Sequence, residues 1–172
     1  MAVVTPQPTP AQTVGPFFHD CLLRTDVLAS DTAADGERIC LRGFVYDGDA
    51  VGVPDAMLEC WQGDRFTRVG TDARGAYTLN SIRPNSVPGG DSLTQAPHLS
   101  LAIFARGLLN HLFTRVYFAD DALNAGDPVL QRVPADRRQT LIAIRDADQS
   151  EPAFRFDIVL QGNGETVFFD FK

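Results

Sequence analysis

The stretch Ile39-Cys-Leu-Arg-Gly-Phe-Val-Tyr46, followed by Asp47-Gly-Asp49, indicates the kind of fold that this chain adopts. Its β-branched and aromatic residues favour a strand, and the Asp-Gly-Asp sequence favours a tight turn. Six similar runs follow, separated by turn residues, at 56–61, 76–82, 99–104, 112–118, 154–160 and 166–171. Seven short strands in a chain of this length predict an all-β fold, a two-sheet β-sandwich.

Two segments stand apart from this strand pattern. Residues 1–18 begin with prolines at positions 6, 8 and 10 among polar residues, which predicts an extended N-terminal arm, the alternative being a frayed terminus. The residues after 119 are polar and interrupted by proline up to about residue 140, which predicts a long loop region with one helical turn. We therefore expect an arm at 1–18 and a single β-sandwich domain at 19–172.

The composition is that of an ordinary folded domain. The chain has 172 residues, of which 44% are hydrophobic, and a formal net charge of −7, which argues against nucleic acid or an anionic membrane surface as its main partner. No apolar run approaches the roughly 18 to 20 residues of a membrane span, and residues 1–13 do not resemble a signal peptide. The three cysteines have no Cys-x-x-Cys spacing, which predicts reduced thiols in a cytoplasmic protein.

The segment Gln95-Ala-Pro-His-Leu-Ser-Leu101 carries the clearest functional signal. Side chains two positions apart on a strand point to the same face, so a His-x-His pair there would direct two imidazoles at one metal ion. In this chain His98 is followed by Ser100, and a serine hydroxyl is a poor replacement for an imidazole. The pattern predicts a chain that belongs to a metalloenzyme but does not itself hold the metal.

Two longer motifs resemble the signature of the intradiol ring-cleaving dioxygenases, which are non-haem iron(III) enzymes that open catechols with molecular oxygen. They are Leu41-Arg-Gly-Phe-Val-Tyr-Asp-Gly48 and Pro54-Asp-Ala-Met-Leu-Glu-Cys-Trp-Gln62. Segments 9–17, 96–101, 104–107, 114–118 and 161–171 resemble the alpha chains of one branch of this family, which is built from alpha and beta chains. The resemblance covers residues 9–171 and implies the intradiol dioxygenase type of sandwich.

The resemblance also implies which positions correspond to the metal ligands. The family holds iron(III) with two tyrosines and two histidines, and the corresponding positions here are occupied by Phe66, Val87, His98 and Ser100. Only His98 keeps a ligand of the expected type. The resemblance therefore implies that this chain binds no metal and that Fe(III) is held by a partner of the same fold, the beta subunit.

A chain without the metal can still line the active site at the junction with that partner. The resemblance implies this role for Thr13, Val14, Gly15 and Pro16 of the arm and for Arg106. The implied substrate, 3,4-dihydroxybenzoate, carries a carboxylate that a guanidinium can bind, and it is cleaved by O₂ between its hydroxyl-bearing carbons in aromatic catabolism. The alternative for Arg106 is an intersubunit or surface salt bridge.

Other interpretations of the same residues remain open. Tyr46, Tyr77 and Tyr117 lie inside strand patterns and are expected to pack in the core or an interface, while His19 and His111 have no second ligand at a useful spacing. An iron enzyme with unexpected ligands is one alternative function. A non-catalytic scaffold or binding module derived from the family is the other.

Overall fold

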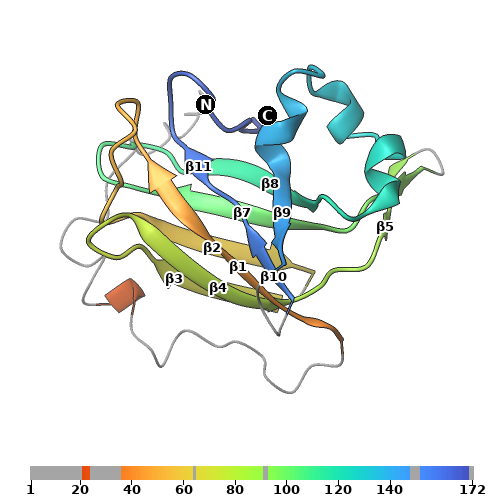
Figure 1. Ribbon diagram of the computed structural model, residues 1–172, viewed down its shortest axis with the longest axis horizontal. Helices are drawn as coiled ribbons and strands as arrows, with labels where there is room; N and C mark the ends of the chain where they lie inside the picture. The colour runs from red at the N-terminus through yellow and green to blue at the C-terminus, as the bar shows by residue number, and fades with distance from the viewer. Residues whose placement is uncertain (1–20, 24–35, 64, 91–92, 148–151, 171–172) are drawn as a thin grey trace, which may run out of the picture.

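The computed structural model describes residues 21–23, 36–63, 65–90, 93–147 and 152–170 (Figure 1). The predicted arm at 1–18, including Thr13, Val14, Gly15 and Pro16, and the predicted boundary after residue 18 lie outside the described residues. Within the described part, no helix has the length and apolar content needed to cross a membrane.

The described residues form mainly strands and short 3-10 helices. The strands are β1 Arg38–Tyr46, β2 Met57–Gln62, β3 Arg65–Gly70, β4 Ala76–Ile82, β5 Val87–Pro88, β6 Thr94–Gln95, β7 His98–Phe104, β8 Leu112–Phe118, β9 Ile142–Asp146, β10 Ala153–Arg155 and β11 Ile158–Val159. The 3-10 helices η3 Ala122–Gly126, η4 Leu130–Arg132 and η5 Arg138–Leu141 occupy the connection between β8 and β9. This confirms the long loop region after residue 119, which contains three short helices where one turn was predicted.

Hydrogen bonds join nine of the described strands into one sheet, in the order β3-β2-β7-β8-β9-β10-β1, with β4 and β11 also paired to β1. β5 and β6 form a separate two-stranded sheet. β9 links the two halves because it pairs in parallel with β8 and antiparallel with β10. The sheet curves until β3 and β4 lie near each other (Figure 1). The all-β class is thus confirmed. The predicted two-sheet sandwich is observed only in part, because β9, which was not predicted, joins its two halves into one nearly closed sheet.

The strand predicted at 154–160 is divided into β10 and β11, which follow one another along the same edge of β1. At the break, the carboxylate of Asp157 accepts the N–H of Phe44 (3.1 Å), so a side chain replaces a backbone acceptor. The carbonyl of Phe156 there lies so close to Gly43 that a Cβ on Gly43 would be 1.9 Å from it. Gly43 is therefore required for this arrangement.

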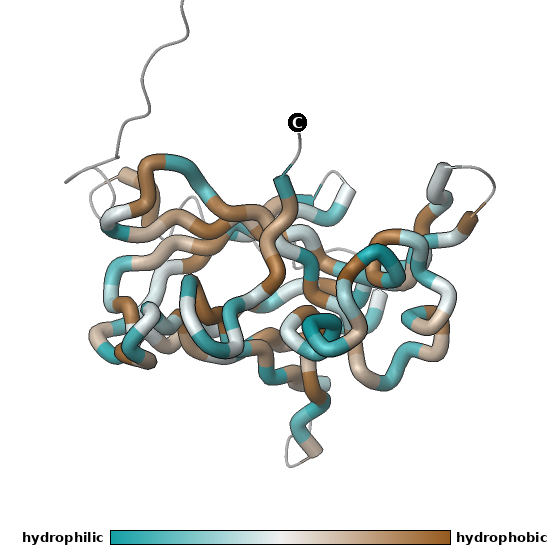
Figure 2. Tube along the Cα trace, turned by 90° about the horizontal axis from the view of Figure 1, so that it is seen from above, coloured by the Kyte–Doolittle hydropathy of each residue, from teal (hydrophilic) through white to brown (hydrophobic). Residues whose placement is uncertain are grey.

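The main core lies between the inner faces of the two halves of the sheet. Hydrophobic and hydrophilic stretches are interspersed along the chain (Figure 2), and burial alternates along β1, where Ile39, Leu41 and Val45 are buried. They pack with Leu58, Cys60, Leu79, Leu99, Leu101, Ile103, Val116, Phe118, Phe154 and Ile158. Tyr77 and Tyr117 are also buried, which confirms their predicted packing role. Tyr46 stacks on Phe44 (5.6 Å between ring centroids).

A smaller second core lies under the η3–η5 connection and contains Ala96, Tyr117, Leu130, Val133 and Leu141. Its centre is the fully buried carboxylate of Asp127. Asp127 Oδ1 accepts the N–H groups of residues 129 (2.9 Å) and 130 (2.7 Å) and the Tyr117 hydroxyl (3.0 Å), and Oδ2 accepts the Ala96 N–H (2.8 Å). The Asp127 side chain therefore links the η3–η5 connection to Ala96, which lies just before β7.

The prediction of a strand at 166–171 is wrong for residues 166–170, which are the part that the structure describes. This segment makes a single bridge, between Phe169 and Phe113, and the Thr166 hydroxyl accepts the N–H of Val159 (3.0 Å). Side-chain hydrogen bonds thus take the place of a ladder. β3, with the sequence Arg-Phe-Thr-Arg-Val-Gly, was not among the predicted strands.

Candidate functional site

His98 and Ser100 lie in β7, between β2 and β8. His98 is directly opposite Tyr117, and Ser100 is directly opposite Trp61 on one side and Arg115 on the other. Directly opposite residues place their side chains on the same face of a sheet, and so do residues two apart on one strand. The prediction that His98 and Ser100 share a face is therefore confirmed.

Phe66 belongs to the same face. It is directly opposite Trp61 in the β2–β3 ladder, and the two rings pack at 4.5 Å between centroids. Cross-strand pairing thus produces a row that runs Phe66, Trp61, Ser100, Arg115 across four strands. Phe66 and Ser100, two of the four positions assigned to metal ligands, belong to this row. His98, the third, lies two residues before Ser100 in β7.

Val87 is linked to this row through Gln95 and Arg115. It lies in β5 opposite Gln95 of β6, and the Gln95 side chain accepts a hydrogen bond from Arg115 (2.7 Å). Val87 itself is 43% exposed. The structure therefore connects all four degenerate positions through β7 and its neighbours, and adds Arg115 and Gln95, which were not predicted. The signal that could have identified Arg115 is a cation two positions before Tyr117 in a strand that is otherwise mostly apolar.

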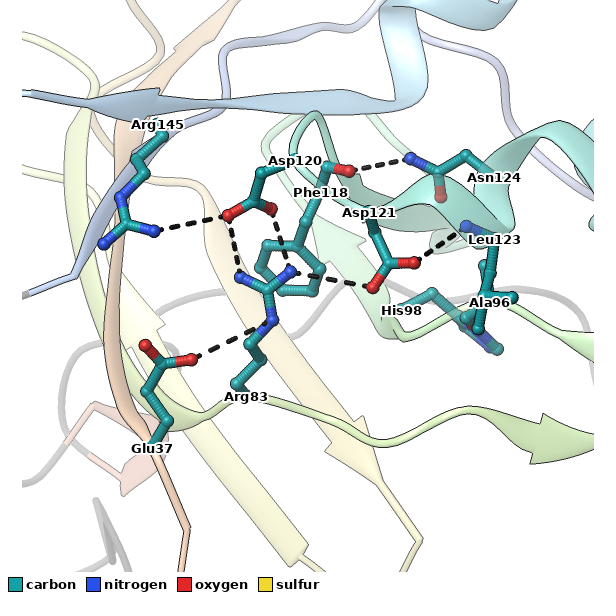
Figure 3. A network of polar contacts seen from close by, with 10 residues as sticks. All are labelled: Glu37, Arg83, Ala96, His98, Phe118, Asp120, Asp121, Leu123, Asn124 and Arg145. Atoms are coloured by element: carbon teal, nitrogen blue, oxygen red, sulfur yellow. Dashed lines mark hydrogen bonds and ion pairs between the residues drawn. The ribbon is translucent and has the colours of Figure 1, made fainter.

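The segment from β4 to β5, which carries Val87, is held by an ionic network around Arg83 (Figure 3). The Arg83 guanidinium pairs with Asp120 (2.8 Å), Asp121 (3.6 Å) and Glu37 (3.9 Å) and lies over the Phe118 ring at 4.8 Å. The hydrogen bond from Arg83 is the main reason why the pKa of Asp120 is lowered. Arg83 thus contacts the end of β8, the turn that follows it, and Glu37, which precedes β1.

These residues do not fit a ferric ion. Phe66 and Val87 offer no donor atom, and Ser100 offers only a hydroxyl. The imidazole of His98 hydrogen-bonds through Nδ1 to the Ala96 carbonyl (2.7 Å), and burial is the main reason why its pKa is lowered, so the ring is neutral near pH 7. Over the residues that the structure describes, no group of three or more His, Cys, Asp and Glu side chains could hold a metal.

Arg106 lies at the other end of β7, two residues beyond its last residue, Phe104. A seven-residue strand spans roughly 20 Å, so Arg106 and His98 are at opposite ends of the sheet. The side chain of Arg106 is 79% exposed, and its Nε donates to the Asp55 carboxylate (2.6 Å). In this chain the Arg106 side chain therefore forms a salt bridge with Asp55, and neither Nη group makes a hydrogen bond to a described residue. His111 is exposed between the rings of Phe104 and Phe113.

The sheet and the row beside His98 are in keeping with the dioxygenase class. A family comparison agrees, because residues 14–162 match the dioxygenase family, and the chain belongs to that family. The expected family membership is confirmed. The chain is 41% identical to the protocatechuate 3,4-dioxygenase alpha chain of Burkholderia cepacia over 98% of this chain and 100% of that protein. It is 30% identical to the beta chain from the same organism, over 91% of this chain and 77% of that one.

A solved structure supports the same fold. The dioxygenase domain of a dioxygenase and carbohydrate-binding fusion protein from Streptomyces sp. SirexAA-E matches with a TM-score of 0.63 and 25% identity, over 91% of this chain and 99% of that one. The fold of this chain is therefore similar to that of a solved dioxygenase domain.

Proposed function

We propose that this chain is the alpha subunit of a protocatechuate 3,4-dioxygenase. Such an enzyme cleaves protocatechuate with O₂ between its hydroxyl-bearing carbons to give 3-carboxy-cis,cis-muconate in aromatic catabolism, and Fe(III) is held by the beta subunit. The proposal is supported by the higher identity to an alpha chain than to a beta chain. The observation that carries it is a dioxygenase-type sheet in which His98 is the only imidazole or phenol among the four positions assigned to metal ligands.

In this proposal the contribution of the chain is to position the substrate and exclude water at the junction with the beta subunit. The residues assigned to this wall are Thr13, Val14, Gly15, Pro16 and Arg106. The Asp55 carboxylate orients the Arg106 guanidinium through Nε, while neither Nη group has an acceptor among the described residues. A guanidinium held in this way presents two parallel donors, which suits the carboxylate of an aromatic acid.

The same proposal places the enzyme in the cytoplasm. None of the three cysteines, all of which are described, forms a disulfide. Burial raises the pKa of the Cys60 thiol to about 12, so this thiol is packed in the core as a neutral group. Both observations are in keeping with a reducing compartment.

The decisive experiment is to purify the chain alone, the beta subunit alone and the co-expressed complex, and to measure iron content and oxygen uptake on protocatechuate. We expect the complex to turn over protocatechuate, its iron to be equimolar with the beta subunit, and the chain alone to be inactive. Full turnover by the beta subunit alone would favour the scaffold alternative. Stoichiometric iron retained by this chain alone, with activity, would favour an independent iron enzyme.

A further inference from the structure

Arg115 in β8 is a half-buried cation whose hydrogen-bond acceptors are both uncharged. Its Nη1 donates to Gln95 Oε1 (2.7 Å) and to the Tyr117 hydroxyl (3.4 Å). No carboxylate of the described residues lies within ion-pair distance of it, whereas eight other arginines have one: Arg42, Arg68, Arg74, Arg83, Arg106, Arg137, Arg145 and Arg155. Because withdrawing a guanidinium from water without a counter-charge is unfavourable, this position favours an anion.

The guanidinium of Arg115 is held in a fixed orientation by Tyr117. The Tyr117 hydroxyl donates to Asp127, since a carboxylate only accepts, and its lone pairs are therefore available to Arg115. Burial is the main reason why the pKa of Tyr117 is raised to about 12, so the hydroxyl keeps its proton. Asp127 also accepts three backbone N–H groups, and it makes no direct hydrogen bond or ion pair with Arg115.

Donor groups remain available beside this cation. The Nε and Nη2 groups of Arg115 make no hydrogen bond to a described residue, and neither does the hydroxyl of Ser100, which lies directly opposite on β7. Two adjacent strands therefore present a charged fork and a hydroxyl on the same face. This pair of donors matches the two oxygens of a carboxylate.

An aromatic surface continues the same row. Trp61 lies directly opposite Ser100 on the other side, is 48% exposed, and packs against Phe66. Two strand spacings separate Trp61 from Arg115, which is about 10 Å. A benzene ring that bears a carboxylate fits this span, with its ring over the indole and its carboxylate at the guanidinium.

We infer that the row formed by Trp61, Ser100 and Arg115 binds a small aromatic carboxylate of the benzoate class. Arg115 and Ser100 donate hydrogen bonds to the carboxylate, and Trp61 packs against the ring. Binding requires no metal and no turnover, so this inference stands or falls separately from the function proposed above.

Trp61 is the only tryptophan of the chain, so its fluorescence reports directly on the row. Benzoate is titrated into the full chain, with benzamide as an uncharged ligand of the same shape. We expect saturable quenching by benzoate and at least tenfold weaker binding of benzamide. Arg115→Gln should weaken benzoate binding at least tenfold, whereas the control Arg132→Gln, at an exposed arginine of η4, should leave it unchanged.

Four results would overturn the inference: equal binding of benzamide, undiminished binding by folded Arg115→Gln, sulfate binding as tightly as benzoate, or loss of benzoate binding in the complex with the beta subunit. Sulfate binding as tight as that of benzoate would indicate an adventitious ion only. Loss of benzoate binding in the complex would indicate that a carboxylate of the beta subunit pairs with Arg115. If Arg115→Gln does not fold, as judged by circular dichroism, the comparison of benzoate with benzamide and sulfate on the unaltered chain still decides.

Discussion

Ser100 in β7 lies directly opposite Arg115 in β8, so the position that corresponds to a metal ligand faces a fixed positive charge. A guanidinium on the adjacent strand, about 5 Å away, would repel a ferric ion bound at Ser100. The repulsion would be strong because Ser100 and Arg115 are both half-buried. Phe66 and Val87 offer no donor atom to a metal, and Ser100 offers only a hydroxyl beside this charge. This arrangement suits anions, and it leads to predictions for both the site and the fold.

Arg106→Ala in the co-expressed complex should raise the KM for protocatechuate about tenfold or more, which corresponds to at least ~1.4 kcal/mol. The physical reason is the loss of the guanidinium that the proposal assigns to the substrate carboxylate. The matched control is Arg74→Ala, because Arg74 is 80% exposed and also pairs with a single aspartate, Asp72. Steady-state oxygen uptake measures both variants. Unchanged kinetics of Arg106→Ala would remove this residue from the site.

Asp127→Asn should lower the free energy of unfolding by about 3 kcal/mol or more. The buried carboxylate accepts four hydrogen bonds, and an amide would turn its NH₂ group toward donors that then lose their acceptor. Urea denaturation followed by circular dichroism measures the change. Asp136→Asn, at an exposed position of the same connection, should stay within about 0.5 kcal/mol of the unaltered chain. Similar values for the two variants would contradict the role given to Asp127.

Gly43→Ala should prevent β10 and β11 from pairing with β1, because the new methyl group would lie 1.9 Å from the Phe156 carbonyl oxygen. Backbone atoms must move to relieve this clash, so we expect loss of soluble folded protein or destabilisation by more than about 3 kcal/mol. Gly126→Ala is the control, since its Cβ meets nothing within 4 Å. Thermal unfolding of both variants tests the prediction, and a Gly43→Ala variant that melts like the control would refute it.

Arg83→Gln should destabilise the chain by about 1 to 3 kcal/mol near neutral pH, because the guanidinium pairs with carboxylates and covers the Phe118 ring. The effect should depend on pH in a defined direction. Since Arg83 lowers the pKa of Asp120 below its ordinary value of 3.8, the stabilisation is present above pH 3.8 and is lost as the pH falls through the lower, folded-state pKa.

Urea denaturation between pH 2 and pH 7 measures this dependence. The difference in stability between the unaltered chain and Arg83→Gln should shrink at the acid end of the range. Arg145→Gln serves as the control, because Arg145 contacts the same carboxylate at 3.3 Å but is 52% exposed, and its effect should be smaller. A constant difference across the whole range would show that the ion pair contributes nothing.

Local patterns in the sequence predicted the strands with strong β propensity, and 76–82 and 112–118 agree with β4 and β8 at both ends. β9 was missed because its five residues, Ile-Ala-Ile-Arg-Asp, follow a polar connection and are too few to show a clear period. The division of 154–160 depends on the Asp157 carboxylate and on Gly43, which is more than a hundred residues away. Contacts of this kind do not appear in a local pattern.

The same limit applies to the candidate site. That His98 and Ser100 share a face follows from the period of a strand and was predicted. That Arg115 lies opposite Ser100 depends on the register of β7 against β8, which is set by tertiary packing. That Arg106 and His98 lie at opposite ends of β7 follows from the length of this strand, roughly 20 Å. The salt bridge of Arg106 with Asp55 required the structure, because 51 residues separate the two.

The pairing of β1 has a consequence for the synthesis of the chain. β1 can pair with β4 early, but its opposite edge remains open until β10 and β11 leave the ribosome, more than a hundred residues later. During that interval a nascent chain exposes the unpaired backbone groups of a strand that ends up in the middle of the sheet, which is a template for aggregation. Production of this protein should therefore benefit from slower translation or from chaperones that cover exposed strand edges.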